Sequence, residues 1–490
     1  MHALAPTSLL HVGLLATLIQ VSGAMDGEVP LEPDGQASAQ DPERSRSKPY
    51  PGNKWFGYAS IWLEDLDGDG RNDIAVPDPD FSLATGGAPA RGVVLVLSGE
   101  DGRVLGTLTP APGERNFGYS LAAIDDLDGD GHGELAVWGE TTGLAGARSG
   151  FVRAVSPIGG VVHWERKGAP GFTRVHGIES IADTDGDDIR DVLAWGDHPV
   201  HAASDAWQTF TILSGADGSV VSERPLRRPS WFRIKAMRSL EDLDSDGCPD
   251  LVLLTFEKDE SGIARNRVEL RSGSTGDLIA RLPIEVDLGS ALEVADIDGD
   301  ARSEVLLVTK SGQGLGATEA ASGVPLPGSV LVMDLASRSL RRVIVVRAED
   351  GSPRAVNSLG VLAPGPASQA ESTVDAEDSI PVARSLLVAG SSSAFGEEVN
   401  AWDLEQDRWA WILGGKVAVE RAAAGSNLSG HLGEFVAIDP APDASGCHAA
   451  LTGTGNPYWS SNHTVWCFEP RTGVVRFIVD AHSLYAEAGL

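Results

Sequence analysis

A nine-residue acidic motif, D-x-D-x-D-x-x-x-[DE], occurs five times in this chain of 490 residues, starting at Asp65, Asp126, Asp183, Asp242 and Asp296. Successive starts lie 61, 57, 59 and 54 residues apart. A period of this length is typical of repeat architectures, in which each unit buries its apolar surface against its neighbours. The spacing therefore constrains the fold more than any other feature of the sequence.

Short apolar runs flank each motif, as in YSLAAIDDLDGDGHGELAVWG, and a third run ends in a Gly-containing turn such as LSGEDGRVL. These runs predict short strands joined by hairpins. Two units, over residues 357–414 and 430–480, keep the apolar runs but lack the acidic motif. Seven units of about 60 residues, each with about four strands, predict an all-β, seven-bladed β-propeller. A row of separate β-sandwiches is the alternative, but 60 residues is short for an independent core.

Both ends of the chain differ in composition from the repeats. Residues 1–24 contain an apolar stretch followed by small residues, which predicts a cleavable signal peptide, although no Lys or Arg precedes the stretch. A membrane anchor or a misplaced start is the alternative. Residues 25–53 are rich in Pro, Ser and charge and predict a disordered leader. The propeller is expected over residues 54–484, with a tail at 485–490.

The acidic motif has the composition of a site for a hard cation. Carboxylates at positions 1, 3, 5 and 9 can converge if the loop curls tightly, and oxygen-only ligands suit Ca²⁺ better than Zn²⁺. An EF-hand also needs Glu at position 12, where these loops carry only apolar residues, and helices on both sides. The predicted ligands are Asp65, Asp67, Asp69, Asp73, Asp126, Asp128, Asp130, Glu134, Asp183, Asp185, Asp187, Asp191, Asp242, Asp244, Asp246, Asp250, Asp296, Asp298, Asp300 and Glu304.

Gly at positions 4 and 6 of the motif allows the tight curl, because Gly adopts positive φ without strain. Position 6 is Asp188 in the third loop and Ala301 in the fifth, and position 4 is Ser245 in the fourth. Up to five Ca²⁺ ions are expected, with the fifth site weak or distorted because of Ala301. Five ions carry ten positive charges and would reduce the formal net charge from -32 to -22. The metal is therefore expected to stabilise the fold.

Charge and cysteine content exclude several classes of protein. With 38 basic and 70 acidic residues, the chain lacks the basic surface that nucleic acids require. Outside the signal peptide, no segment is apolar enough to predict membrane insertion. The mature protein is expected to be a secreted or periplasmic monomer. Three cysteines are too few for a disulfide scaffold. Cys447 and Cys467 could pair in the last repeat, whereas Cys248 lies in an acidic loop; three inert thiols are the alternative.

FGYASIWLEDLDGDGRNDIAVPDP and FGYSLAAIDDLDGDGHGELAVWG resemble the FG-GAP repeats of integrin α-chain propellers and of secreted FG-GAP/VCBS repeat proteins. Phe56-Gly57 and Phe117-Gly118 match the FG element, whereas the GAP element is not kept. Later repeats retain only His176-Gly177 and Leu288-Gly289. The resemblance covers residues 54–484. It implies a seven-bladed propeller with Ca²⁺ loops on one face and ligands bound elsewhere. It also implies ring closure by N-terminal residues such as KPYPGNKW.

Three functions follow as expectations, of which the last is a purely structural component of a cell-surface layer. The first is a secreted adhesion or binding module for a protein or glycan, with the insertion at residues 364–381 and the basic run at 224–238 as candidate surfaces. The second is a polysaccharide-active, lyase-like enzyme, since some calcium-bearing propellers are lyases and VNAWDLEQDRWAW is similar to quinoprotein repeats. No catalytic motif supports the enzyme. The histidines are scattered apart from His431, His448 and His463, and sequons occur at Asn427 and Asn462.

Overall fold

The computed structural model describes most of the repeat region. The described residues are 56–57, 59–83, 90–142, 148–167, 174–197, 207–227, 232–258, 264–284, 286–309, 329–346, 356, 358–362, 385–393, 396–404, 408–414, 432–438, 449–454, 464–470 and 475–490. Several predictions fall outside these residues: the signal peptide, the leader, KPYPGNKW, the insertion at 364–381, Cys447, the three last-repeat histidines and both sequons.

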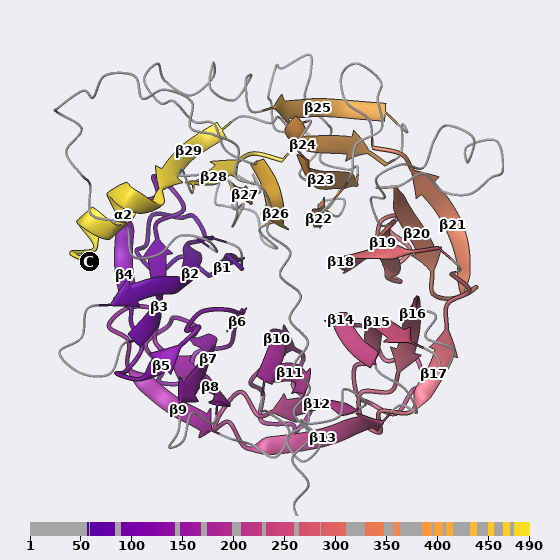
Figure 1. Cartoon of the computed structure of the whole chain (residues 1–490), viewed down its shortest axis with the longest axis horizontal. Coiled ribbons are helices and arrows are strands. Elements are labelled where there is room, and N and C mark those ends of the chain that lie inside the picture. Colours follow the sequence, from indigo (N-terminus) through magenta and orange to yellow (C-terminus); the bar gives the residue numbers. More distant parts are fainter. Residues whose placement is uncertain are drawn as a thin grey trace, which may run out of the picture. The chain divides into compact units, whose positions relative to one another are not determined.

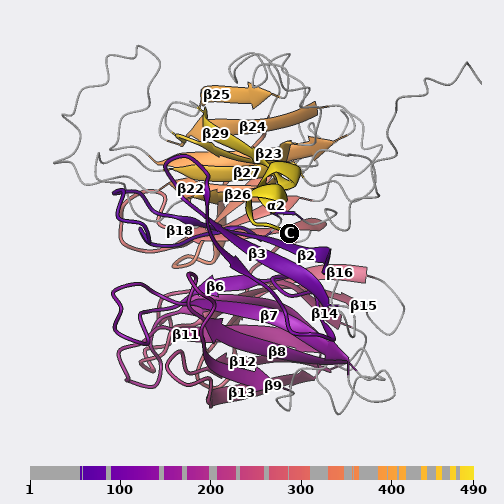
Figure 2. The same ribbon diagram turned by 90° about the vertical axis from the view of Figure 1, so that its left-hand side faces the viewer.

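Seven antiparallel sheets are arranged in a ring, which confirms the predicted all-β, seven-bladed β-propeller (Figure 1). Six sheets have four strands in sequence order. In the second sheet two short segments, β5 and β6, both pair with β7 and form an interrupted innermost strand. The side view in Figure 2 shows the blades stacked one against the next. Among the described residues, no helix is both long and apolar enough to cross a membrane.

The blades take their strands consecutively along the chain. Blade 1 contains β1 (Ile61–Trp62), β2 (Ile74–Leu83), β3 (Ala90–Leu97) and β4 (Val104–Leu108), and blade 2 contains β5 (Glu114–Arg115), β6 (Leu121–Ala123), β7 (Leu135–Thr142), β8 (Arg148–Val155) and β9 (Val162–Lys167). Blade 3 contains β10 (Arg174–Ile181), β11 (Asp191–Asp197), β12 (Trp207–Leu213) and β13 (Val220–Arg227). Blade 4 contains β14 (Phe232–Ser239), β15 (Leu251–Lys258), β16 (Ala264–Arg271) and β17 (Leu278–Arg281). The last three contain β18 (Leu288–Ala295), β19 (Glu304–Thr309), β20 (Val330–Asp334), β21 (Ser339–Ile344); β22 (Ser358–Leu362), β23 (Leu386–Ser393), β24 (Gly396–Asp403), β25 (Arg408–Gly414); and β26 (Leu432–Ile438), β27 (Ala450–Thr454), β28 (Thr464–Phe468), β29 (Val475–Asp480).

The core lies between blades rather than within them. Among the described residues, seven clusters of buried apolar side chains are found, and each joins two neighbouring blades. Phe117 of the predicted FG element is 1% exposed and packs against blade 1, while Gly118 adopts φ +85°. A Cβ on Gly118 would lie 2.7 Å from Val94, so this close approach requires glycine. The second FG element thus acts as a packing element between blades.

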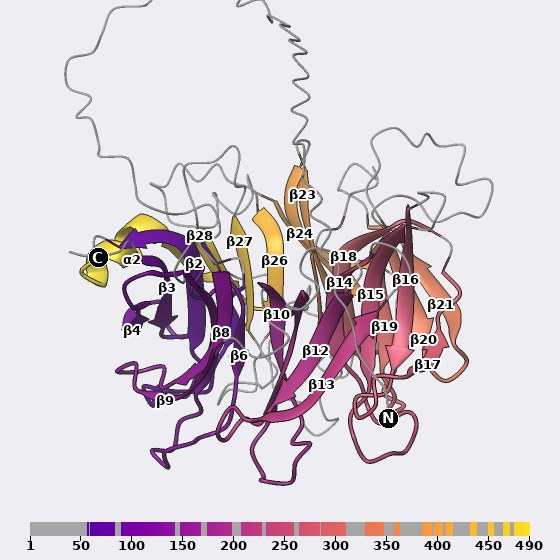
Figure 3. The same cartoon turned by 60° about the horizontal axis from the view of Figure 1, so that its bottom comes forward.

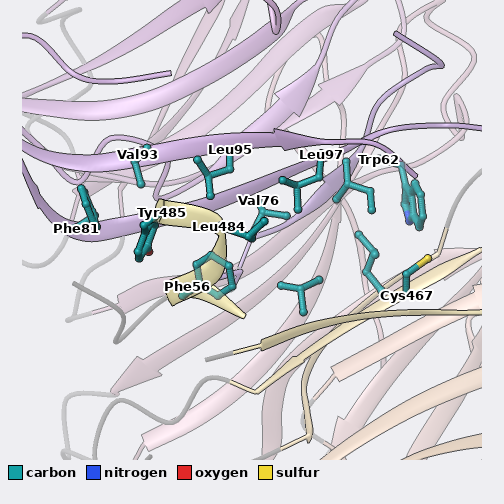
Figure 4. Packing of buried hydrophobic residues seen from close by; sticks show 14 of the residues in the cluster. Phe56, Trp62, Val76, Phe81, Val93, Leu95, Leu97, Cys467, Leu484 and Tyr485 are labelled. Carbon is teal, nitrogen blue, oxygen red and sulfur yellow. The ribbon is translucent and has the colours of Figure 1, made fainter. Parts of the chain in front are cut away.

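Side-chain packing and a C-terminal helix join the last blade to the first. The helix α2 (Ala481–Glu487) follows β29 and places Tyr485, 1% exposed, against Phe56 and Phe81 of blade 1 (Figure 4). The Tyr485 hydroxyl donates to the buried carboxylate of Asp78, and Glu487 accepts from the Val104 N–H at 2.9 Å. The expected tail from residue 485 is therefore wrong, because its first residue belongs to the core. A helix of seven residues is too short to show a clear apolar periodicity in the sequence.

All five acidic loops lie at the same end of the blades. Each connects the first and second strands of its blade, and antiparallel pairing brings the hairpin between the third and fourth strands to that end as well. The oblique view in Figure 3 shows the strands running between the two faces of the ring. One face therefore carries a series of acidic loops, each beside a second hairpin of its own blade.

Candidate metal centres

The first loop curls around the carboxylate at its first position. Asp65 Oδ1 accepts the N–H groups of Gly68 at 2.7 Å and Asp69 at 3.2 Å, and its Oδ2 accepts that of Gly70 at 2.8 Å. These bonds hold the backbone in the turn that brings positions 1, 3 and 9 together. One ligand oxygen each from Asp65, Asp67 and Asp73 lies within 4.8 Å of the others.

The other four loops repeat this geometry. The carboxylate at position 1 accepts the N–H of position 4 at 2.6–2.7 Å and that of position 6 at 2.8–2.9 Å in every loop. All 20 predicted ligands are therefore in five equivalent loops. Each of the first four loops contains an acidic triplet whose ligand atoms lie within 4.8 Å of one another. An oxygen-only donor set of this kind fits Ca²⁺.

Positions 4 and 6 adopt positive φ in all five loops, as the Gly pattern predicts. The non-glycine residues there are Asp188 at φ +68°, Ser245 at +63° and Ala301 at +66°. Ala301 keeps the same hydrogen bond to Asp296 as its counterparts, at 2.9 Å. The expected distortion of the fifth loop is thus wrong for its backbone, which holds a strained residue in the common geometry.

The carboxylate at position 9 is the buried member of each set. Asp73, Glu134, Asp191, Asp250 and Glu304 are 0–1% exposed. Burial raises the pKa of all five, and that of Asp73 to about 6, because the charged form loses its hydration. A buried carboxylate beside two or three others is costly to ionise unless a cation compensates it.

Sequence reasoning missed a Ser-Gly pair that supports three of the loops. After the third strand of blade 1, Ser98 Oγ donates to Asp69 at 3.1 Å and the Gly99 N–H donates to Asp73 Oδ1 at 3.0 Å. A Cβ on Gly99 would lie 1.8 Å from the Asn72 carbonyl oxygen, so no other residue fits there. The same contacts recur in the third and fourth blades. The sequence carries this signal as LSGEDG, LSGADG and RSGSTG, in which the Gly-containing pattern by itself predicts only a turn.

The second and fifth loops lack this pair and have Glu rather than Asp at position 9. Pro157, which has no N–H, takes the place of Gly99 in blade 2, and Leu335 takes it in blade 5. In both blades, a nitrogen-bearing side chain of the fourth strand approaches the Glu. His163 Nε2 lies 3.4 Å from Glu134 Oε1, and Arg341 Nη1 lies 3.0 Å from Glu304 Oε1.

His163 and Arg341 occupy equivalent positions. Each is the extra residue of a β-bulge between the third and fourth strands of its blade. The bulge residues of blades 1, 3 and 4 are apolar: Leu105, Val221 and Ile279. Bulges redirect a side chain, and here they direct a nitrogen toward the loop only in the blades with Glu at position 9. Arg341 also contacts Asp298 at 2.5 Å, so a guanidinium already compensates part of the negative charge of the fifth loop.

Neighbouring loops are joined by a second set of contacts. The carboxylate just before one motif accepts the N–H at position 8 of the next: Glu64 from Gly133, Asp125 from Arg190 at 2.6 Å, and Glu241 from Ser303 at 3.2 Å. This contact is missing between the third and fourth loops. Ala182, just before the third motif, has no carboxylate, and Pro249, at position 8 of the fourth, has no N–H. The loops thus form two linked groups, loops 1–3 and loops 4–5.

The basic run at 224–238 is divided between the outer strand of blade 3 and the centre of the ring. Arg224 lies on the outer strand β13, where its Nε donates to the Ser274 carbonyl at 2.8 Å. Arg233, Lys235 and Arg238 lie on β14 and line a central cavity of about 980 Å³. Lys235 Nζ donates to the Leu288 carbonyl at 2.8 Å. Trp231 lies outside the described residues, and Cys467 is buried in the core on β28.

No family model matches the sequence. Integrin alpha-IIb of Homo sapiens is 37% identical over 110 residues, which cover 21% of this chain and 9% of the integrin. Among solved structures, the Dos1 propeller is 9% identical, covers 88% of this chain and 84% of that one, and has a TM-score of 0.41. Rhamnogalacturonan lyase YesW is 13% identical, with 81% and 70% coverage and a TM-score of 0.42. The chain is a seven-bladed β-propeller with local similarity to an integrin α-chain, consistent with an FG-GAP-like propeller.

Proposed function

We propose that this chain is a secreted, calcium-stabilised β-propeller that acts as a binding or adhesion module for a protein or glycan and has no catalytic activity. The observation that supports calcium binding most strongly is the buried carboxylate at position 9, repeated in five loops of the same geometry. The local similarity to integrin alpha-IIb supports the same proposal.

Calcium binding would connect the strands of a blade. In blade 1, Asp73 is the last residue of the loop. Its carboxylate accepts the N–H groups of Leu66 and Gly99, which belong to two different hairpins. A cation bound to Asp65, Asp67 and Asp73 would supply positive charge where burial disfavours the carboxylate. Because the unfolded chain has no such arrangement, binding would add to the free energy of unfolding.

The cavity at the centre of the ring is the candidate ligand surface. Its β14 wall presents the exposed Arg233, together with Lys235, whose Nζ donates to the Leu288 carbonyl, and Arg238, which is paired with Glu179; Glu293 lines the same cavity. Tyr119 also lines it and offers an aromatic ring to a sugar or a side chain. This combination favours a partner with carboxylate groups, such as an acidic peptide or a uronate-containing glycan.

Two measurements test the proposal. Thermal unfolding is expected to occur at lower temperature in excess EDTA and to recover in millimolar Ca²⁺; an unchanged melting curve contradicts calcium binding. Screening of glycan and protein arrays, with and without Ca²⁺, is expected to find ligands that an Arg233→Ala/Lys235→Ala variant no longer binds. Depolymerisation of a bound polysaccharide in the same samples would instead favour the lyase-like enzyme.

A further inference from the structure

The second loop differs chemically from the oxygen-only loops. His163 Nε2, a Glu134 oxygen and an Asp128 oxygen all lie within 4.8 Å of one another. The imidazole nitrogen is 3.4 Å from Glu134 Oε1 and 3.8 Å from Asp128 Oδ2. The side chains of His163 and Glu134 are 13% and 1% exposed, so both are held in place by the surrounding blade.

The free oxygen of Glu134 results from the local sequence. Glu134 Oε2 accepts the Leu127 N–H at 2.6 Å, as the position 9 residue does in every loop. In the loops that carry Asp, the second oxygen accepts a Gly N–H from the Ser-Gly pair. Pro157 removes that donor from blade 2, so Glu134 Oε1 faces the imidazole instead.

We propose that the second loop is a mixed nitrogen–oxygen site that selects a borderline transition metal of the Zn²⁺ class, with His163, Glu134 and Asp128 as ligands. This inference rests on the proposed function, because it assigns a different metal to one of the proposed calcium loops. Imidazole and carboxylate together suit Zn²⁺, whereas Ca²⁺ prefers oxygen ligands alone.

The fifth loop provides an internal comparison. Arg341 takes the place of His163 at the same bulge, but a guanidinium has no lone pair to offer a metal and stays protonated. Arg341 is therefore a permanent internal cation, whereas neutral His163 can be a ligand. In blade 2 the Ser156 hydroxyl lies 2.8 Å from Nε2, and metal binding exchanges that hydrogen bond for a coordinate bond.

The test uses the full, untagged chain with its calcium sites filled. Protein in millimolar Ca²⁺ is equilibrated with micromolar Zn²⁺, dialysed against the same Ca²⁺ buffer, and assayed for bound zinc by mass spectrometry. We expect one zinc per wild-type chain and none in the His163→Gln variant. The Arg341→His variant, which places imidazole beside Glu304 and Asp298, is expected to bind a second zinc. In the wild-type chain, cobalt substituted for zinc reports a site with four or five ligands by the intensity of its visible absorption, whatever the stability of the variants.

The outcomes separate the two proposals. Equal zinc content in wild type and His163→Gln, or no zinc in either, overturns the mixed site. The calcium-induced rise in melting temperature is measured on the same samples. If wild type and His163→Gln both show that rise but neither retains zinc, only this inference fails. If neither responds to Ca²⁺, the proposed calcium function fails as well.

Discussion

The buried carboxyl of Asp73 makes the effect of pH on stability depend on the metal. Burial raises its pKa to about 6 in the folded, metal-free chain, from an ordinary value of 3.8. The folded state therefore binds this proton more tightly than the unfolded state does. Its stabilising contribution is complete below pH 3.8 and is lost as pH rises through 6. Metal-free protein is expected to become more stable on acidification from pH 7 to pH 5.

The size of the effect follows from these two pKa values. Between pH 7 and pH 5 the protonation of Asp73 adds about 1.3 kcal/mol to the free energy of unfolding. For a fold of roughly 430 residues this corresponds to a rise of about 1.5 °C in melting temperature. The other four carboxyls at position 9 also have raised pKa values and add in the same direction. In saturating Ca²⁺ the sign reverses, because protons then compete with the metal for the same oxygens.

The assay is differential scanning fluorimetry at pH 5, 6 and 7, in EDTA and in millimolar Ca²⁺. In EDTA, Asp73→Asn is expected to remove about 1.5 °C of the rise in melting temperature between pH 7 and pH 5. The same variant is expected to show a smaller calcium-induced rise in melting temperature. Asp277→Asn, which changes an exposed carboxylate in a turn of blade 4, is the matched control. The reasoning is refuted if metal-free stability falls from pH 7 to pH 5, or if Asp73→Asn has the same slope as wild type.

Three further substitutions test other contacts. In Gly99→Ala the new Cβ would lie 1.8 Å from a carbonyl oxygen, so the hydrogen bond to Asp73 should be lost and the free energy of unfolding should fall by about 1.5–3 kcal/mol. Gly289→Ala is the control: its nearest neighbouring atom is 3.5 Å away, and its stability should not change. Asp125→Ala should weaken calcium binding by the third loop about tenfold in calorimetric titration, and unchanged affinity would show that the link between loops is not coupled to the metal. Tyr485→Phe should cost about 1–3 kcal/mol in thermal unfolding, equally with and without Ca²⁺; a calcium-dependent loss would contradict its role in ring closure.

The fold could be predicted because its determinants are local and repeated. The motif spacing, the apolar runs and the Gly-containing turns all recur within one unit, so seven blades and five loops follow from the sequence. The ligands themselves are also local, since positions 1 to 9 are joined by hydrogen bonds within one turn, as Asp65 shows.

The supporting contacts could not be predicted in the same way, because they join residues far apart in sequence. Glu64 contacts the loop of the next blade 69 residues later, and Gly99 contacts Asp73 from a different hairpin. His163 reaches Glu134 only because a bulge redirects its side chain, and a bulge is visible only once the register of the strands is known. Tyr485 closes the ring from 407 residues away.

The central claim is that the acidic loops bind calcium, and the number of bound ions tests it most directly. Equilibrium dialysis in millimolar Ca²⁺, followed by elemental analysis, is expected to find three to five ions per wild-type chain. The triple variant Asp65→Asn/Asp183→Asn/Asp242→Asn removes the position 1 carboxylate from the three loops that the Ser-Gly pair supports, and it should bind three fewer ions than wild type. A wild-type chain without bound calcium, or a triple variant with the same number of ions as wild type, would contradict the account.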